Sequence, residues 1–114
     1  MKNWMVAVVA VAMGVAVSAA LTIPVLVLGM GAETVVDYAL RFKADFGRGT
    51  WVCGYADDMI AYIPSRRVWA EGGYEGGPNL YEYGRPALRW AGDIEERIAT
   101  SVRKLVKSVT EKAP

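Results

Sequence analysis

The chain has 114 residues, which is enough for one domain with a single core and too few for two. Its 13 lysines and arginines against 12 acidic residues give a net charge of +1, so we expect no nucleic-acid partner. The chain contains no histidine, which excludes Ser-His and Cys-His catalysis and the commonest metal ligand from the polypeptide acting alone.

An uncharged apolar run spans residues 5–30, with Lys2 just ahead of it. One interpretation is an export signal that is cleaved near Ala19 or Ala20, where small residues suit the cleavage site. The other is an uncleaved membrane anchor, because the run reaches the ~20 residues that cross a bilayer. A buried segment, or a start site placed too early, is a third interpretation. We expect an apolar helix over about residues 1–20, and a protein that is periplasmic, extracellular or membrane-anchored.

The pattern that follows predicts a strand, a helix and a second strand. Residues 22–28 form an apolar run typical of a strand buried on both faces, and Pro24 argues against a helix that continues from the preceding run. Residues 33–46 repeat apolar side chains at helical spacing, and Gly47 is a natural stop. Residues 50–54 predict a second buried strand. The unit should be a βαβ crossover with parallel strands.

Side chains suited to chemistry gather around this unit. Glu33 would begin the helix, where amide groups and the helix dipole favour a carboxylate, or would serve a site at the carboxyl end of a strand. Because parallel strands end on one edge, Glu33 should lie near residues 55–62. Asp57 and Asp58 are a carboxylate pair for acid/base work or a cation, or a polar loop with a helix cap. The single cysteine, Cys53, cannot form an internal disulfide and should be a small buried hydrophobe.

The second half of the chain predicts two helices separated by a loop rich in glycine and tyrosine. Residues 63–65 read as a capping sequence for a short helix over residues 66–71. Tyr74 stands between two Gly-Gly pairs, as in a backbone bent to present its side chain or in a plain flexible loop. The last helix should begin near Asp93, whose spacing to Glu96 resembles a capping box. Its core face should carry Ile94, Ile98, Val102, Leu105, Val106 and Val109, opposite a solvated side of Arg97, Arg103, Lys104 and Lys107.

Three segments together resemble the neutral/alkaline non-lysosomal ceramidases, and especially the bacterial ceramidase-like proteins. They are GMGAETVVDYALRF, GYADDMIAYIPSRRVWAEGGYEGG and DIEERIATSVRKLV. The resemblance covers roughly residues 21–109 and corresponds to the C-terminal part of the family's catalytic domain. It implies a zinc-dependent amidase that cleaves the N-acyl bond of ceramide and releases sphingosine and a fatty acid. In that family two histidines, a glutamate and a tyrosine hold the zinc, and a serine takes part in the chemistry.

By motif position, the family's zinc-binding glutamate falls on Glu33, and the zinc-binding tyrosine that opens YIPS falls on Tyr62. A second tyrosine, which faces the substrate amide, falls on Tyr74. Ala32 replaces the glycine that precedes the family's glutamate, and both histidine ligands, the serine and the strands that carry them are missing. We therefore expect zinc only with a complementary histidine-bearing fragment, and no activity from the chain alone.

The predicted fold class is α/β, as a small partial βαβα unit with two parallel strands, a crossover helix, a Gly/Tyr-rich loop region and a C-terminal helix. The resemblance implies that the chain is a gene fragment, a split subunit or a degenerate copy of a ceramidase-like hydrolase. The alternative is an exported or membrane-tethered non-catalytic module that binds lipid or a partner protein through the aromatic residues of the 74–90 loop. A remnant without a stable function is the third possibility.

Overall fold

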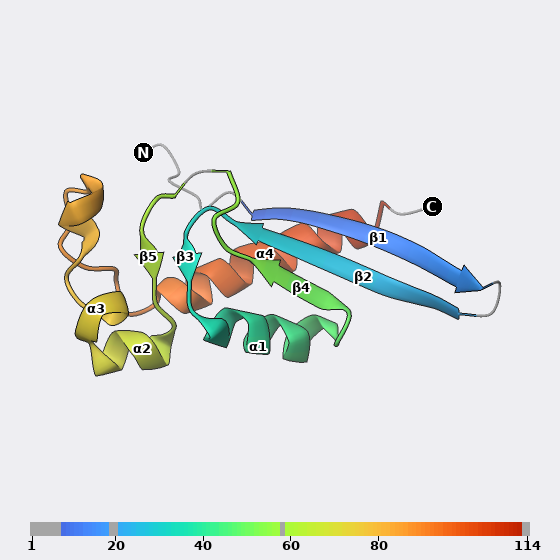
Figure 1. Cartoon of the computed structure of the whole chain (residues 1–114), viewed down its shortest axis with the longest axis horizontal. Coiled ribbons are helices and arrows are strands. Elements are labelled where there is room, and N and C mark those ends of the chain that lie inside the picture. The colour runs from blue at the N-terminus through green and yellow to red at the C-terminus, as the bar shows by residue number, and fades with distance from the viewer. Residues whose placement is uncertain (1–7, 19–20, 58, 113–114) are drawn as a thin grey trace.

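The computed structural model describes the backbone of residues 8–18, 21–57 and 59–112, and the side chains from residue 25 onward within these ranges. It is a small α/β fold with two sheets (Figure 1). The larger sheet has the order β1-β2-β4, and the smaller sheet pairs β3 with β5. The strands are β1 (Val8–Ser18), β2 (Leu21–Met30), β3 (Glu33–Thr34), β4 (Thr50–Cys53) and β5 (Tyr62–Ile63).

Within the residues that the structure describes, four α-helices and one 3₁₀ helix complete the fold. They are α1 (Val36–Phe46), α2 (Arg66–Glu71), α3 (Gly73–Gly76), the 3₁₀ helix η1 (Leu80–Tyr83) and α4 (Ile94–Thr110). The predicted βαβ unit is confirmed, because β2 and β4 run parallel and α1 connects them. Gly47 ends α1 as predicted: its φ is 103°, and its N–H donates to the Lys43 carbonyl at 2.9 Å.

The N-terminal segment is a strand where the sequence predicted a helix. β1 pairs antiparallel with β2 from Val8↔Met30 to Ser18↔Leu21. The prediction overlooked the many valines of this segment, whose branched side chains favour a pleated strand. Residues 1–7 and 19–20 lie outside the described chain, and so does the predicted cleavage site. No helix of the described residues has the length and apolar character needed to cross a membrane.

The core lies between the sheet and the two long helices, with α4 behind the larger sheet in Figure 1. The amphipathic prediction for α4 is confirmed, since Ile98, Val102 and Val106 are buried and its basic residues are exposed. Each such side chain contributes about 1.5–3 kcal/mol when fully buried. The whole buried cluster consists of Leu28, Met30, Ala32, Tyr38, Phe42, Ile63, Ile98, Ala99, Val102 and Val106.

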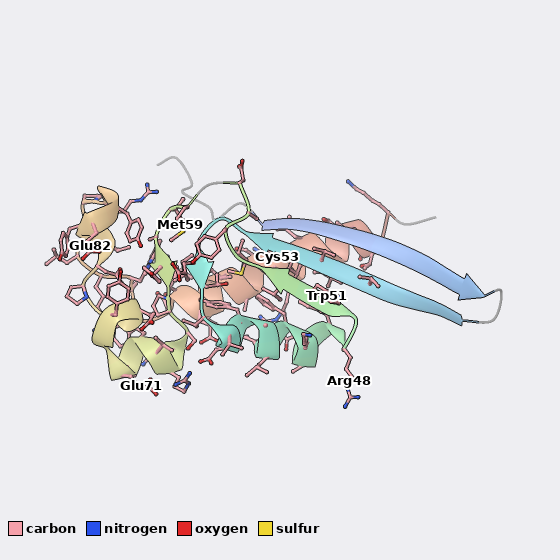
Figure 2. The ribbon with its side chains drawn as sticks, in the orientation of Figure 1. Arg48, Trp51, Cys53, Met59, Glu71 and Glu82 are labelled. Atoms are coloured by element: carbon pink, nitrogen blue, oxygen red, sulfur yellow. The ribbon has the colours of Figure 1, made fainter. Side chains whose placement is uncertain are left out.

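One face of β4 remains open, which corrects the prediction of a buried strand over residues 50–54. Thr50 is fully buried, whereas Trp51 is 63% exposed and Cys53 is also exposed (Figure 2). Successive strand residues point to opposite faces, and the buried cluster with its helices occupies one of them. Cys53 is therefore not the small buried hydrophobe that its apolar neighbours predicted.

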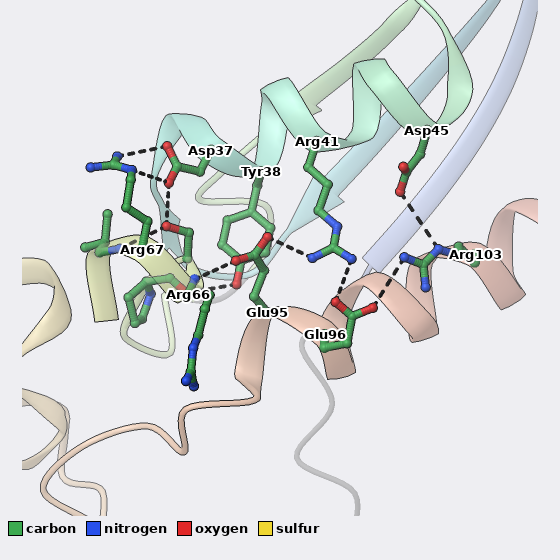
Figure 3. A network of polar contacts seen from close by, with 12 residues as sticks. Asp37, Tyr38, Arg41, Asp45, Arg66, Arg67, Glu95, Glu96 and Arg103 are labelled. Atoms are coloured by element: carbon green, nitrogen blue, oxygen red, sulfur yellow. Dashed lines mark hydrogen bonds and ion pairs between the residues drawn. The ribbon is translucent and has the colours of Figure 1, made fainter. Parts of the chain in front are cut away.

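A network of charges joins α1, α2 and α4 (Figure 3). Arg41 donates to Glu95 at 2.8 Å and to Glu96 at 2.7 Å, which fastens α1 to α4. Asp37 accepts hydrogen bonds from Arg67 and from Ser65, and these bonds hold the pKa of its carboxyl below the usual range. The network thereby fixes the end of β5 against α1.

The sequence predicted side-chain caps for two helices, and only one of these caps is present. Ser65 caps α2 as predicted, because its hydroxyl accepts a hydrogen bond from the Val68 N–H at 3.2 Å. The capping box predicted for α4 is wrong, since the Asp93 side chain makes no cap hydrogen bond. Its carboxylate instead pairs with Arg97 at 2.8 Å, one turn further along the helix.

Candidate functional site

Glu33 lies on strand β3, so the prediction that it begins a helix is wrong. Its N–H donates to the Ala61 carbonyl at 3.1 Å, which draws Glu33 into the pairing of β3 with β5. Val35 then takes the N-cap position with an extended backbone, φ −78° and ψ 156°. Asp37 is the acidic residue of the first turn of α1. The backbone hydrogen bond from Glu33 to Ala61, a residue far away in the chain, therefore determines where α1 begins.

Glu33 and Tyr62 are direct partners in the parallel pairing of β3 with β5. The expected neighbourhood of these two residues is therefore present. The neighbouring Glu33 carboxylate, and after it the Tyr74 side chain, raise the pKa of the Tyr62 phenol above its ordinary value. The phenol is thus neutral and a proton donor at physiological pH.

Two further tyrosine rings pack against Tyr62. The Tyr74 ring lies 5.1 Å from the Tyr62 ring, and the Tyr83 ring lies 6.1 Å from it, both centroid to centroid at interplanar angles of 70°. Tyr74, on α3, was predicted to face the site, and its carbonyl accepts a hydrogen bond from the Asn79 amide at 2.6 Å. Sequence reasoning missed Tyr83, on η1. Only the aromatic content of the glycine-rich loop pointed toward it.

A fourth tyrosine, Tyr55, approaches Glu33 from the loop after β4 and was also missed. The Glu33 carboxylate near its phenol raises the pKa of Tyr55. Its backbone is left-handed, with φ 56°, a conformation that a bulky residue rarely adopts. Asp57 shares this feature, with φ 70°, and is exposed. Asp58 lies outside the described residues, so the predicted carboxylate pair stays a prediction.

Hydrogen bonds from tryptophan side chains help to fix the position of strand β5. Trp90 Nε1 donates to the Tyr62 carbonyl at 2.7 Å, and Trp69 Nε1 donates to the Trp90 carbonyl at 2.8 Å. The Tyr38 hydroxyl also donates to the Pro64 carbonyl at 3.0 Å, which fastens the end of β5 to α1. These contacts fix the position of the Tyr62 backbone, so its phenol extends from a strand that hydrogen bonds hold in place.

The donors of the site are oxygen atoms, and they fit only part of a zinc shell. Glu33 and Tyr62 can each offer one ligand, whereas catalytic zinc uses three protein ligands and commonly histidine nitrogen. The sequence has no histidine. Within the described residues, no group of three or more His, Cys, Asp and Glu side chains is placed to hold a metal ion. Glu33 and Tyr62 therefore match only the oxygen ligands of such a site.

Comparison of the chain with models of known protein families, with curated proteins and with solved structures finds no match. The ceramidase resemblance stays a prediction from the three sequence segments.

Proposed function

We propose that this chain is the carboxylate- and tyrosine-bearing part of a ceramidase-like amide hydrolase that needs a histidine-bearing complement. The observation that supports the proposal is the meeting of three residues that are far apart in the chain. Glu33 and Tyr62 are direct strand partners, and Tyr74 packs its ring against Tyr62. These are the three positions to which the family's motif assigns two metal ligands and a substrate contact.

In this proposal the chain's own residues orient the reacting groups. Glu33 and Tyr62 are strand partners, and the Glu33 carboxylate raises the pKa of the Tyr62 phenol, which favours its neutral form. Tyr74 is 60% exposed, so its phenol is accessible to donate a hydrogen bond to a substrate amide. Zinc, when bound, would polarise the amide carbonyl and acidify a bound water.

The substrate class that fits is a lipid amide such as N-acylsphingosine. Exposed apolar and aromatic side chains lie in the same half of the chain as Tyr74, among them Tyr81 at 58% and Leu88 at 66% exposure. Aromatic rings with a polar end favour the boundary between an apolar phase and water, where such a lipid presents its amide. The localisation that accompanies this function is an exported or membrane-anchored protein.

The complement must supply the groups that this chain lacks, namely imidazole ligands and a serine. The test combines this chain with a candidate complement, a polypeptide encoded beside it that carries two histidines and a serine, in the presence of zinc. We expect N-acylsphingosine cleavage only from the mixture. Cleavage should be lost with Glu33→Gln and Tyr62→Phe.

A matched control uses Glu82, whose carboxylate accepts a hydrogen bond from the Tyr81 hydroxyl at 3.3 Å and which plays no part in the proposed site. Glu82→Gln should leave cleavage unchanged. A complement that binds this chain tightly and still gives no cleavage would contradict the proposal.

The exposed rings of Tyr74 and Tyr81 also favour a second candidate, a non-catalytic module that binds lipid. Liposome binding separates the two candidates. Binding that survives both a chelator and Tyr62→Phe would support the module, and binding that is lost with the chelator would count against it.

A further inference from the structure

We propose that a cluster of three tyrosine rings binds a quaternary ammonium group, with the Glu33 carboxylate beside it as the opposite charge. The rings are those of Tyr62, Tyr74 and Tyr83. The occupant is a trimethylammonium group such as that of choline. This property goes beyond the proposed amide hydrolysis, because it depends on ring faces and needs neither zinc nor the phenol hydroxyls.

The three rings meet at steep angles. The Tyr74 and Tyr83 rings each lie at 70° to the Tyr62 ring, with centroids 5.1 and 6.1 Å from it. A cation binds over the face of an aromatic ring, within about 6 Å of its centroid. Stacked rings cover these faces, whereas two rings at a steep angle form a corner in which both faces stay open. At the observed separations, one cation in such a corner can lie within reach of two ring faces.

The rings of this cluster are not part of the hydrophobic core. None of the three belongs to the buried cluster of the described residues or to the side chains packed against it. Tyr74 is 60% exposed, and Tyr62 and Tyr83 are half-buried. The elements β3, β5 and α3 lie at the same end of the molecule (Figure 1). Neighbouring apolar groups at a protein surface commonly mark a binding site, so this cluster is available to a ligand.

Close packing of the backbone fixes the position of Tyr74 before any ligand binds. A Cβ atom at Gly76 would overlap the Val68 carbonyl oxygen, so only glycine lets α3, which carries Tyr74, lie this close to α2. The Asn79 amide also donates to the Tyr74 carbonyl at 2.6 Å. Side chains that are already in position lose less conformational entropy when they bind, which increases affinity.

The charge beside the rings favours a cation. Glu33 is the direct partner of Tyr62 in the parallel pairing of β3 with β5, and paired strands lie about 4.8 Å apart. None of the ion pairs in the described part of the chain involves Glu33, so a ligand can supply the opposite charge. A primary ammonium needs acceptors for three N–H groups, whereas a quaternary ammonium has none to donate. Ring faces with a nearby carboxylate therefore suit the quaternary ion best.

The test measures the binding of choline chloride to the full chain by isothermal titration calorimetry, without zinc. One control ligand is the neutral analogue of choline, in which a tert-butyl group replaces the trimethylammonium group. The other is ethanolamine, which keeps the charge on a primary ammonium. We expect choline to bind at least about tenfold more tightly than either. Equal binding of the neutral analogue, or no binding of choline, would overturn the proposal, and this comparison needs no variant.

Variants separate the rings from their hydroxyl groups. Tyr74→Phe keeps the ring and should bind choline within about twofold of the wild-type chain, whereas Tyr74→Leu should weaken binding at least about fivefold. Glu33→Gln should weaken it by about threefold or more. The matched control is Trp51→Leu, which removes an exposed ring from β4 and should leave choline binding unchanged. Circular dichroism establishes that each variant is folded, and equal binding by wild type and a folded Tyr74→Leu would contradict the proposal.

Two further measurements identify the source of the cation and separate this property from amide hydrolysis. Sedimentation with phosphatidylcholine vesicles that excess free choline reverses would assign the site to a lipid headgroup, and choline binding without vesicle binding would assign it to the free cation. Phosphatidylglycerol vesicles are the control. Tyr62→Phe should retain choline binding and lose the amide cleavage of the complemented mixture, so the failure of one function is distinguishable from the failure of the other.

Discussion

Helix α1 borders two regions that differ in the charges of their side chains. Along its length, α1 meets α2 and α4 through paired charges, in which Arg41 contacts Glu95 and Glu96 (Figure 3). Before its first turn, the chain places one carboxylate, that of Glu33, among neutral phenols. Opposite charges that satisfy each other brace a fold. Neutral phenols supply no opposite charge to a carboxylate, so the first region braces the fold and the second is the one to which we assign the proposed site.

The largest loss of stability should come from a substitution in the hydrophobic core. Phe42 is fully buried and lies between the rings of Tyr38 and Phe46, at 6.1 and 6.0 Å. Phe42→Ala should lower the free energy of unfolding by about 3–5 kcal/mol, measured by urea denaturation. Leu40→Ala, on the same helix but with Leu40 63% exposed, should change it by less than about 0.5 kcal/mol. Equal effects of the two would contradict the packing described here.

Breaking the ion pairs of Arg41 should have a smaller effect. The Arg41 and Glu95 side chains are only 23% and 15% exposed, so Arg41→Met leaves the partly buried Glu95 carboxylate without an opposite charge, although it still accepts a hydrogen bond from the Arg66 N–H. We expect a loss of about 1–2 kcal/mol in the free energy of unfolding, and a loss that shrinks at high salt. Arg97→Met breaks the solvent-exposed pair with Asp93 and should leave the melting temperature unchanged. A larger effect at Arg97 than at Arg41 would reverse this ranking.

A third prediction concerns acid stability and the Asp37 carboxyl. Hydrogen bonds from Arg67 and Ser65 lower its folded pKa, so the unfolded state binds the proton more readily. The stabilisation is fully present above the unfolded pKa of about 3.9 and is lost as pH falls through the folded pKa. Denaturation curves at several pH values should show this loss in the wild-type chain. Asp37→Asn should lack that step, and an unchanged acid profile would contradict the role of Asp37.

The smallest effect should appear at the phenols, as a change in their titration. The neighbouring Glu33 carboxylate raises the folded pKa of Tyr62, so the stabilising contribution of this contact is present below the unfolded pKa of about 10 and is lost as pH rises through the folded value. Ultraviolet absorbance during alkaline titration should show late phenol ionisation. Glu33→Gln should move part of this ionisation to lower pH. The buried Tyr38, whose pKa burial raises, should still titrate late and serves as the internal reference.

Local patterns in the sequence determined the elements that depend on residues close together in the chain. The helical spacing of α4, the Ser65 cap of α2 and the Gly47 stop of α1 each involve residues within about two helical turns. The parallel βαβ unit followed as well, because a helical pattern between two apolar runs allows few other arrangements. The closeness of Glu33 and Tyr62 came from the same rule about strand ends.

Tertiary structure alone decided which faces are covered and which phenols reach Glu33. An apolar run reads the same whether one face or two are buried, so the exposure of Trp51 and Cys53 depended on where the helices pack. Glu33 is a strand residue because its N–H donates to the Ala61 carbonyl. Tyr55 has a left-handed backbone, which the residue types at and around position 55 did not predict. Periodicity is a property of neighbours in the chain. Strand pairing and the meeting of side chains depend on contacts between distant segments, which only the folded chain contains.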